Sequence, residues 1–285
     1  MQASNARDRH PPAGDSLGRM APPRPYLAHP PVALAHRGGA LYAPNLGLEN
    51  TLTAFGNAVA LGYTHLETDV HVTKDGQLVA FHDIRLDRVG DRAGRLRSLP
   101  WEQVQAARLG SGPAHERVPL LSEVVEAFRD ICLNIDLKAP GTARPLWQLI
   151  EELDLHDRVC VGSFQQRHLS AFRRLSRGRV VTAAGVTGTA LLRFSPEWLT
   201  ALVRTPADVL QVPASVPLRG RRFQLVTDRF IEAAHRHGKH VHVWTIDDED
   251  EMHRLLDLGV DGLVSDRIDV LKDVLVQRGV WTGAR

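Results

Sequence analysis

Apolar or β-branched residues alternate with Glu67, Asp69 and His71 in the segment HLETDVHV, residues 65–72. A period of two is typical of a strand with two different faces, so both carboxylates and the histidine should lie on one face. A TKDG turn follows, and a short apolar run then ends at His82. Residues 73–77 are too few to connect parallel strands, so this run should return antiparallel as a β-hairpin.

Hydrophobic periodicity along the whole chain predicts eight strands separated by helices. The strands are expected at residues 33–37, 66–72, 132–138, 159–164, 180–184, 209–212, 240–244 and 262–264. Apolar residues recur with helical spacing between them, as in 121–128 and 146–153, and a last helix is expected at 268–277. This order predicts an α/β fold, a (β/α)8 TIM barrel with a β-hairpin excursion after strand 2. A doubly wound open sheet is disfavoured, because no glycine-rich dinucleotide loop follows any strand.

The pattern also divides the chain. Residues 1–30 are rich in Pro and Arg and lack an apolar core, so we expect a flexible N-terminal extension. Residues 31–285 should form the barrel domain, whose typical size is ~250 residues. The segment 84–119 is long for a barrel connection, and we expect it to contain a short helix near 101–108 and to cover part of the barrel mouth.

Composition narrows the function classes. The formal net charge is only +2 and no basic stripe is present, so a nucleic-acid partner is not expected. The sequence has no apolar run of about 18 residues and no signal-peptide core, which predicts a cytoplasmic protein without an integral membrane segment. Cys132 and Cys160 lie in apolar strand-like runs and should be buried core residues.

Polar residues concentrate where the predicted strands end, and such barrels carry their active sites at the carboxyl ends of the strands. The residues expected there are His36, Arg37, Glu67, Asp69, Asp136, Lys138 and Trp244, and His240 and His242 should share the face of Trp244 further back along the same strand. Converging carboxylates repel one another unless a positive charge lies between them. Their oxygens suit a divalent cation such as Mg²⁺ or Ca²⁺, and the alternative is a salt-bridge network with Arg37 and Lys138.

Two histidines complete this chemistry. His36 and His82 titrate near neutral pH and should both lie near the carboxylates. Arg37 and Lys138 are equally suited to bind a phosphate. Together these residue types favour metal-assisted cleavage of a phosphodiester, with the two histidines transferring the protons.

Ordered motifs in the chain resemble the glycerophosphodiester phosphodiesterase family. They are AHRGG (35–39), ENT (49–51), LETDV (66–70), TKDG (73–76), FHD (81–83), NIDLK (134–138), SF (163–164), VWT (243–245) and GVDGLVSD (259–266). The resemblance covers essentially all of residues 31–285. Each motif is weak alone, but their order and spacing are specific.

The resemblance implies a metal-dependent hydrolase that cleaves glycerophosphodiesters to sn-glycerol 3-phosphate and an alcohol. It implies the following roles: general acid and base for His36 and His82; metal ligands for Glu67, Asp69 and Asp136; phosphate contacts for Arg37 and Lys138; a substrate-binding place at the site edge for Glu49, as a ligand or as a support for the ligands; and a wall of the substrate pocket for Trp244. Two features depart from the family. Asp136 stands where the family often has Glu, and the loop 39–51 is longer than the family's shortest version.

Two other functions compete with this one. A lysophospholipase D-type hydrolase would use the same residues and would need a longer apolar groove at the barrel mouth. A phosphodiester-binding barrel without turnover would have lost a histidine or a carboxylate, and both sets are present. Whether water or a substrate hydroxyl attacks the phosphorus stays open, as does the oligomeric state. His71 is expected to be structural, and His235, His237 and His240 are expected at the opposite rim.

Overall fold

The computed structural model describes residues 24–110, 115–196, 205–218 and 220–283. Eight parallel strands form a barrel in these segments. In order around the barrel they are β1 (Val32–His36), β2 (His65–Val72), β6 (Cys132–Leu137), β7 (Val159–Gly162), β8 (Val181–Thr182), β9 (Val209–Pro213), β12 (His240–Trp244) and β13 (Gly262–Ser265). A single parallel bridge between Ala183 and Val209 joins β8 to β9, and β13 pairs with β1 to complete the circle.

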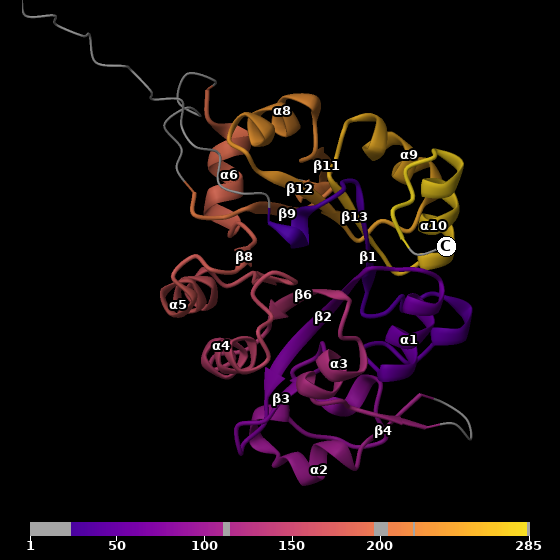
Figure 1. Cartoon of the computed structure of the whole chain (residues 1–285), viewed down its shortest axis with the longest axis vertical. Helices are drawn as coiled ribbons and strands as arrows, with labels where there is room; N and C mark the ends of the chain where they lie inside the picture. The colour runs from indigo at the N-terminus through magenta and orange to yellow at the C-terminus, as the bar shows by residue number, and fades with distance from the viewer. Residues whose placement is uncertain (1–23, 111–114, 197–204, 219, 284–285) are drawn as a thin grey trace, which may run out of the picture.

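Helices lie outside these strands (Figure 1). They are α1 (Leu52–Ala60), α3 (Leu121–Ala127), α4 (Ala143–Glu152), α5 (Gln166–Ser176), α6 (Val186–Phe194), α8 (Asp228–Arg236), α9 (Glu249–Asp257) and α10 (Ile268–Gln277). Thr51, Thr227 and Asp248 start three of them, because each side-chain oxygen accepts a backbone N–H of the first turn. The predicted TIM barrel is therefore confirmed, and the last helix has the predicted bounds.

The alternation along β2 separates two environments. Leu66 and Val70 point outward into the apolar layer between strands and helices. Glu67 and Asp69 point inward and are 6% and 1% exposed. Parallel pairing places Asp69 directly opposite Asp136 of β6, so the two strands present their carboxylates at the same height. The convergence that the sequence predicts therefore follows from strand register.

The predicted hairpin excursion is confirmed. Strand β3 (Leu78–Ala80) pairs antiparallel with the end of β2. Gly76 in the connecting turn has φ = +88°, a conformation that favours glycine. After β3, the N–H of Phe81 donates to the carbonyl of Asp69, which brings the next residue, His82, to the rim that bears the carboxylates.

The insertion after β3 forms a small unit of its own. It contains η3 (Leu86–Arg88), η4 (Leu96–Ser98), α2 (Trp101–Gln105), β4 (Arg108–Leu109) and β5 (Glu116–Arg117). Eight buried apolar residues form its separate core. None of the described residues of 84–119 lines the cavity at the barrel mouth, so the prediction that this segment covers part of the mouth is wrong. Its apolar side chains are buried in its own core, so the insertion packs beside the barrel instead.

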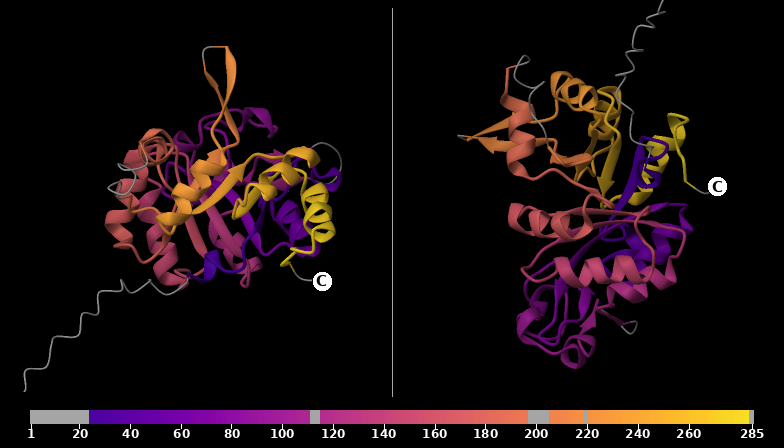
Figure 2. Two further views of the ribbon diagram at one scale, coloured as in Figure 1. Left: turned by 90° about the horizontal axis from the view of Figure 1, so that it is seen from above. Right: turned by 60° about the vertical axis from the view of Figure 1, so that its left-hand side comes forward.

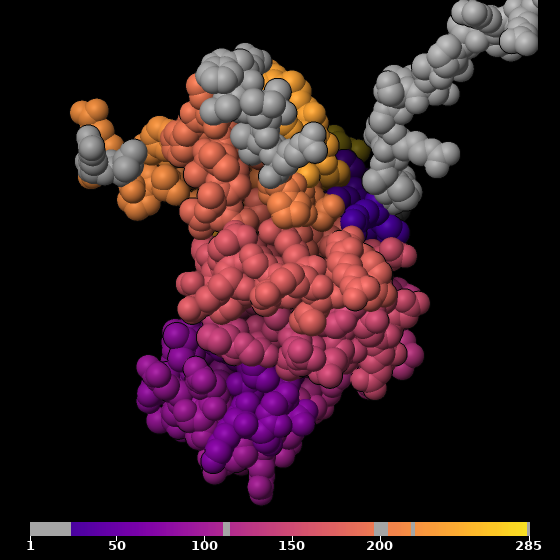
Figure 3. Space-filling model, turned by 90° about the vertical axis from the view of Figure 1, so that its left-hand side faces the viewer, coloured from indigo at the N-terminus to yellow at the C-terminus, as the bar shows by residue number. Residues whose placement is uncertain are grey.

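A second hairpin was not predicted. Strands β10 (Ser215–Leu218) and β11 (Arg221–Gln224) pair antiparallel between β9 and α8. This hairpin projects away from the body of the protein (Figures 2 and 3).

The predicted flexible extension is too long at its carboxyl end. Residues Pro25–Leu27 form a 3-10 turn, and Tyr26 is fully buried. Its ring packs with Cys160, Val181 and Val209 at the start of the strands. The rest of the predicted extension, residues 1–23, lies outside the described residues. Cys160 is fully buried, as expected, whereas Cys132 is only partly buried.

No helix in the described part of the chain combines the length and apolar character required to cross a membrane.

His242 of β12 lies inside the barrel beneath the rim and is fully buried. Neither ring nitrogen has a hydrogen-bond partner among the described residues. Burial lowers the pKa of His242 to about 3, with smaller contributions from His240 and His65. The unfolded chain binds a proton at His242 below pH ~6.5 and the folded chain does not, so folding stability falls as pH falls through that range.

We therefore expect His242 to cost about 2 kcal/mol of stability at pH 5 relative to pH 7.5. Replacing His242 by Leu should remove this pH dependence and raise the melting temperature most at pH 5. Denaturant unfolding at both pH values measures the effect. The exposed His115 provides a control, since His115→Leu should leave the slope unchanged. An equal slope in His242→Leu and the parent protein would contradict the assignment.

Candidate active site

A cavity of about 590 Å³ opens at the carboxyl ends of the barrel strands. Its polar end is lined by His36, Arg37, Glu67, Asp69, His82, Asp136 and Lys138. Its other end is lined mostly by apolar residues of β9, α6 and the β10–β11 hairpin. The structure thus brings together eight of the nine residues that the sequence predicts for the site, because Trp244 lines the same cavity and only Glu49 does not.

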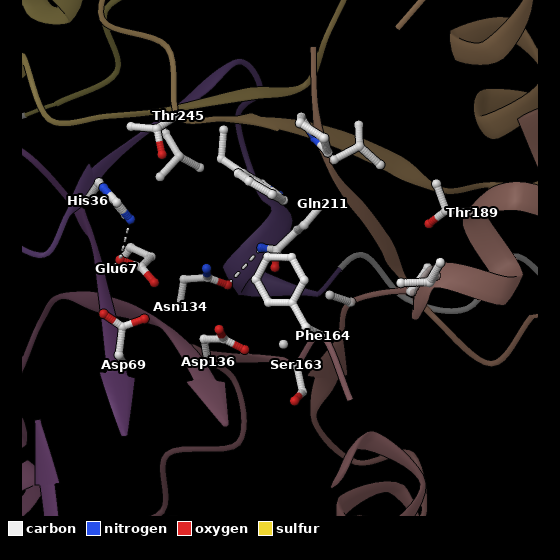
Figure 4. A pocket seen from close by; sticks show the side chains of 18 of the residues that line it. His36, Glu67, Asp69, Asn134, Asp136, Ser163, Phe164, Thr189, Gln211 and Thr245 are labelled. Atoms are coloured by element: carbon white, nitrogen blue, oxygen red, sulfur yellow. Dashed lines mark hydrogen bonds and ion pairs between the residues drawn. The ribbon is translucent and has the colours of Figure 1, made fainter. Parts of the chain in front are cut away.

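A sharp turn presents His36 to the cavity. Residues Arg37, Gly38 and Gly39 all have positive φ values, and a Cβ on Gly38 would lie only 2.8 Å from the backbone of α1. His36 Nδ1 lies 2.8 Å from Asp266 Oδ1, and its Nε2 lies 3.8 Å from Glu67 Oε2 (Figure 4). Burial acts to lower the pKa of His36, but Glu67 and the bond to Asp266 outweigh it, so the pKa lies above its ordinary value. Asp266 therefore orients the ring and favours its protonated form.

The three inward carboxylates point toward a common region (Figure 4). Burial and the neighbouring Asp69 raise the pKa of Glu67 to about 7. Burial acts to raise the pKa of Asp69, but Lys138 and Arg37 outweigh it and hold the pKa below its ordinary value. Burial raises the pKa of Asp136, although Lys138 partly opposes this. Lys138 and Arg37 thus do not fully compensate the negative charge of the three carboxylates, and Glu67 in particular keeps a raised pKa.

Two cations contact these carboxylates. Lys138 Nζ lies 2.9 Å from Asp69 Oδ1 and 2.7 Å from Asp136 Oδ2. Arg37 Nε lies 3.2 Å from Asp69 Oδ2, but without the geometry of a hydrogen bond, so this buried N–H has no acceptor among the described residues. The salt-bridge network considered from the sequence is thus present.

His82 lies at the end of the hairpin. Its Nδ1 is 2.6 Å from Asp83 Oδ1, and Arg88 holds Asp83 through its guanidinium. The Nε2–H of His71 donates to the carbonyl of His82 at 3.0 Å. The structural role expected for His71 is confirmed, because it fixes the backbone that carries His82.

Glu49 does not line the cavity. Both of its oxygens accept hydrogen bonds from Arg88, and Arg37 Nη1 donates to it at 3.3 Å. Asn50, in the same motif, donates to Asp69 Oδ2 at 3.2 Å. Residues 49 and 50 therefore position the cavity residues from behind, and the structure does not place Glu49 among the residues that could touch a substrate in the cavity.

The floor and one wall of the cavity contain residues without a predicted role. Gln211 of β9 donates to Asn134 Oδ1 at 2.8 Å, and both line the cavity (Figure 4). Phe164 packs edge to face against Trp244 with ring centroids 5.4 Å apart, and Lys138 Nζ lies 5.6 Å from the Phe164 ring. The aromatic pair separates the charged end of the cavity from its apolar end.

Residues 36–270 match the family model described as the glycerophosphoryl diester phosphodiesterase family. The chain belongs to this family. It is an enzyme of the phosphoric diester hydrolase class, as the motifs predicted.

Curated relatives agree with this membership, and a solved structure has the same fold. The chain is 37% identical to the "Probable glycerophosphodiester phosphodiesterase 2" of Mycobacterium tuberculosis, covering 89% of this chain and 94% of the relative. It is 29% identical to the "Lysophospholipase D GDPD1" of Rattus norvegicus, with 85% of each chain covered. The phosphodiesterase of Oleispira antarctica, solved with the product sn-glycerol-3-phosphate, superposes with a TM-score of 0.69 at 23% identity, covering 87% of this chain and 97% of that one.

Enzymes of this family generally depend on a divalent cation. The donors of this chain have the right chemistry, because Glu67, Asp69 and Asp136 supply hard carboxylate oxygens. Their charge also fits. The charged side chains that line the cavity are these three carboxylates, Arg37 and Lys138, so the site carries one net negative charge apart from its histidines. Within the described residues, no group of three or more His, Cys, Asp or Glu side chains is close enough to hold an ion, and Lys138 lies between Asp69 and Asp136 instead.

Asp266 was the main residue that sequence reasoning missed. It lies within the motif GVDGLVSD, directly after β13, so its place at a strand end was a signal that could have suggested a role. Its contact with His36 joins residues far apart in the chain, and no local pattern predicts that pairing.

Proposed function

We propose that this glycerophosphodiester phosphodiesterase is metal-dependent and cleaves its substrate to sn-glycerol 3-phosphate and an alcohol. The observation that carries the proposal is the convergence of two histidines, three carboxylates and two cations on the polar end of one cavity. A phosphodiester is an anion, and with all three carboxylates ionised the cavity carries one net negative charge apart from its histidines. A divalent ion among Glu67, Asp69 and Asp136 would reverse that sign and supply Lewis-acid stabilisation of the phosphoryl oxygens.

The histidines would transfer the protons. Cleavage requires one proton to leave the attacking oxygen and one to reach the departing alkoxide, so two groups in opposite protonation states are needed. His36 is oriented by Asp266 and His82 by Asp83. These carboxylates fix the Nδ1–H tautomer and leave each Nε2 for the substrate.

Arg37 and Lys138 would hold the phosphate. The guanidinium of Arg37, which lines the cavity beside Asp69, would donate to a phosphate oxygen. Lys138 would exchange a carboxylate for a second phosphate oxygen, because an ion bound to Asp69 and Asp136 competes with it for both. Trp244 and Phe164 would form the wall against the group bonded to the phosphate.

A lysophospholipase D-type activity is a second candidate, and one observation favours it. The cavity continues past the aromatic pair into a space lined by Ala183, Ala184, Val186, Ala190, Phe194, Val212, Val216 and Leu225. A deacylated headgroup has no apolar part to fill this space, whereas an acyl chain would gain by leaving water there. The relative from Rattus norvegicus bears that activity in its name.

Comparing glycerophosphocholine, glycerophosphoethanolamine and lysophosphatidylcholine at equal concentration would test both candidates. We expect the glycerophosphodiesters to release glycerol 3-phosphate, measured with a coupled dehydrogenase assay. Release of choline from lysophosphatidylcholine with a kcat/KM well above that for glycerophosphocholine would establish the second candidate instead. Without turnover of any of the three, the proposed function would be wrong.

A further inference from the structure

Large apolar side chains are exposed mainly at one end of this barrel. Most of those described follow the carboxyl end of a strand or lie on α6: Leu41, Leu46, Ile84, Phe164, Val186, Leu191 and Phe194. The remaining exposed large apolar residue within the described segments is Val276, in the last turn of α10. Clusters of exposed apolar residues commonly mark a surface that contacts a partner.

Three of these side chains also line the cavity. Phe164, Val186 and Phe194 are 59%, 67% and 61% exposed, and we call them the apolar rim. Phe164 follows β7, whereas Val186 and Phe194 are the two ends of α6. The apolar interior of the cavity is therefore continuous with the apolar surface around its mouth.

The β10–β11 hairpin extends this surface and adds positive charge. Phe223 of β11 packs on Phe194 with ring centroids 5.7 Å apart. Arg193 stacks on both rings, and its guanidinium donates to the carbonyls of Gln224 and Leu225, which fixes the hairpin against α6. The hairpin and the rim thus form one connected face.

Arginines dominate the charge of this face. The described residues of 186–196 and 215–229 contain Arg193, Arg221, Arg222 and Arg229, and only one carboxylate, that of Asp228. Arg221 and Arg222 lie on the projecting hairpin, are exposed, and form no ion pair within the described part of the chain (Figure 2). Basic residues beside exposed apolar anchors are the pattern of proteins that bind the surface of an anionic bilayer.

We propose that the apolar rim and the β10–β11 hairpin dock this protein on an anionic lipid surface. The rim would enter the interface between headgroups and acyl chains, and Arg221 and Arg222 would contact lipid phosphates. Because Phe164, Val186 and Phe194 also line the cavity, a lipid surface seated on them would bring the mouth close to molecules that contain a phosphodiester. Docking is a binding property and is measured without turnover, so it can fail independently of the proposed reaction.

Vesicle sedimentation tests whether the positive charge of the hairpin contributes to lipid binding. We expect binding to phosphatidylcholine vesicles that contain phosphatidylglycerol, weak binding to pure phosphatidylcholine, and loss of binding as salt rises. The double variant Arg221→Ser/Arg222→Ser should bind about 5-fold more weakly per arginine removed. The exposed Arg129 and Arg174 precede strands at the opposite end, so Arg129→Ser/Arg174→Ser makes the same change in net charge and should bind like the parent. Glycerophosphocholine turnover should be unchanged in both variants.

A fluorescent probe tests the apolar rim. Cys160 is fully buried and burial raises the pKa of Cys132 to about 11, so an introduced cysteine should be labelled selectively. A polarity-sensitive dye on Val186→Cys should shift to the blue with anionic vesicles, and the same dye on Val276→Cys should not. The proposal is overturned if vesicles do not bind, if the Arg129/Arg174 control loses binding equally, or if both dyes shift alike. It is also overturned if the variant Arg221→Ser/Arg222→Ser differs from the parent only in self-association, measured by light scattering.

Discussion

Replacing His82 by alanine should lower kcat by about 10²–10⁴-fold, because the variant loses one of two proton-transfer groups. The hairpin exists to bring His82 to the rim, where Asp83 orients it and His71 fixes its carbonyl. His36→Ala should have an effect of the same order. The two losses should not multiply in the double variant, since the histidines act on one transition state.

Two readouts separate this role from a structural one. The parent should show a bell-shaped pH–rate profile, and each single variant should lose one limb of it. His71→Ala is the matched control, because it removes a buried histidine that contacts only the backbone of residue 82 through its Nε2. Its activity should fall far less. Turnover close to that of the parent in His82→Ala would show that the proton donor or acceptor lies elsewhere.

Removing divalent cations should reduce activity to background, and Mg²⁺ or Ca²⁺ should restore it. Without an ion, the carboxylates of the cavity outnumber its cations and would repel a phosphodiester. Glu67 adds a pH dependence with a definite sign. Its pKa is about 7, so it is half protonated at pH 7 and must lose that proton to ligate the ion. Apparent ion affinity should therefore fall as pH falls below 7, by about 10-fold per unit.

Calorimetric titration with Mg²⁺ or Ca²⁺ in buffers of different ionisation enthalpy measures this proton release. We expect about half a proton per ion at pH 7, and none in Glu67→Gln. His36→Ala and His82→Ala should still bind the ion, which distinguishes the loss of ligands from the loss of proton transfer. Full activity in excess chelator would refute metal dependence. Unchanged ion affinity in Asp136→Asn would remove Asp136 from the ligand set.

The sequence by itself determined the barrel and most of the polar end of the cavity. Side chains alternate strictly along a strand, so one segment placed Glu67 and Asp69 on the same face. Parallel neighbours end at the same rim, so the pattern also predicted that Asp136 and Lys138 would meet them. The short turn at Gly76 allowed only an antiparallel return, which brought His82 back. All of these inferences use local periodicity and connection length.

Only the tertiary structure decided the contacts that depend on closure of the barrel. Asp266 reaches His36 because β13 pairs with β1, and Gln211 reaches Asn134 across the interior. Tyr26 is buried against residues at the start of the strands, although the composition of its segment favoured flexibility. The apolar half of the cavity likewise forms where α6 meets an unpredicted hairpin. Local pattern fixes which face a side chain lies on, but its partner across the barrel depends on how all eight strands close.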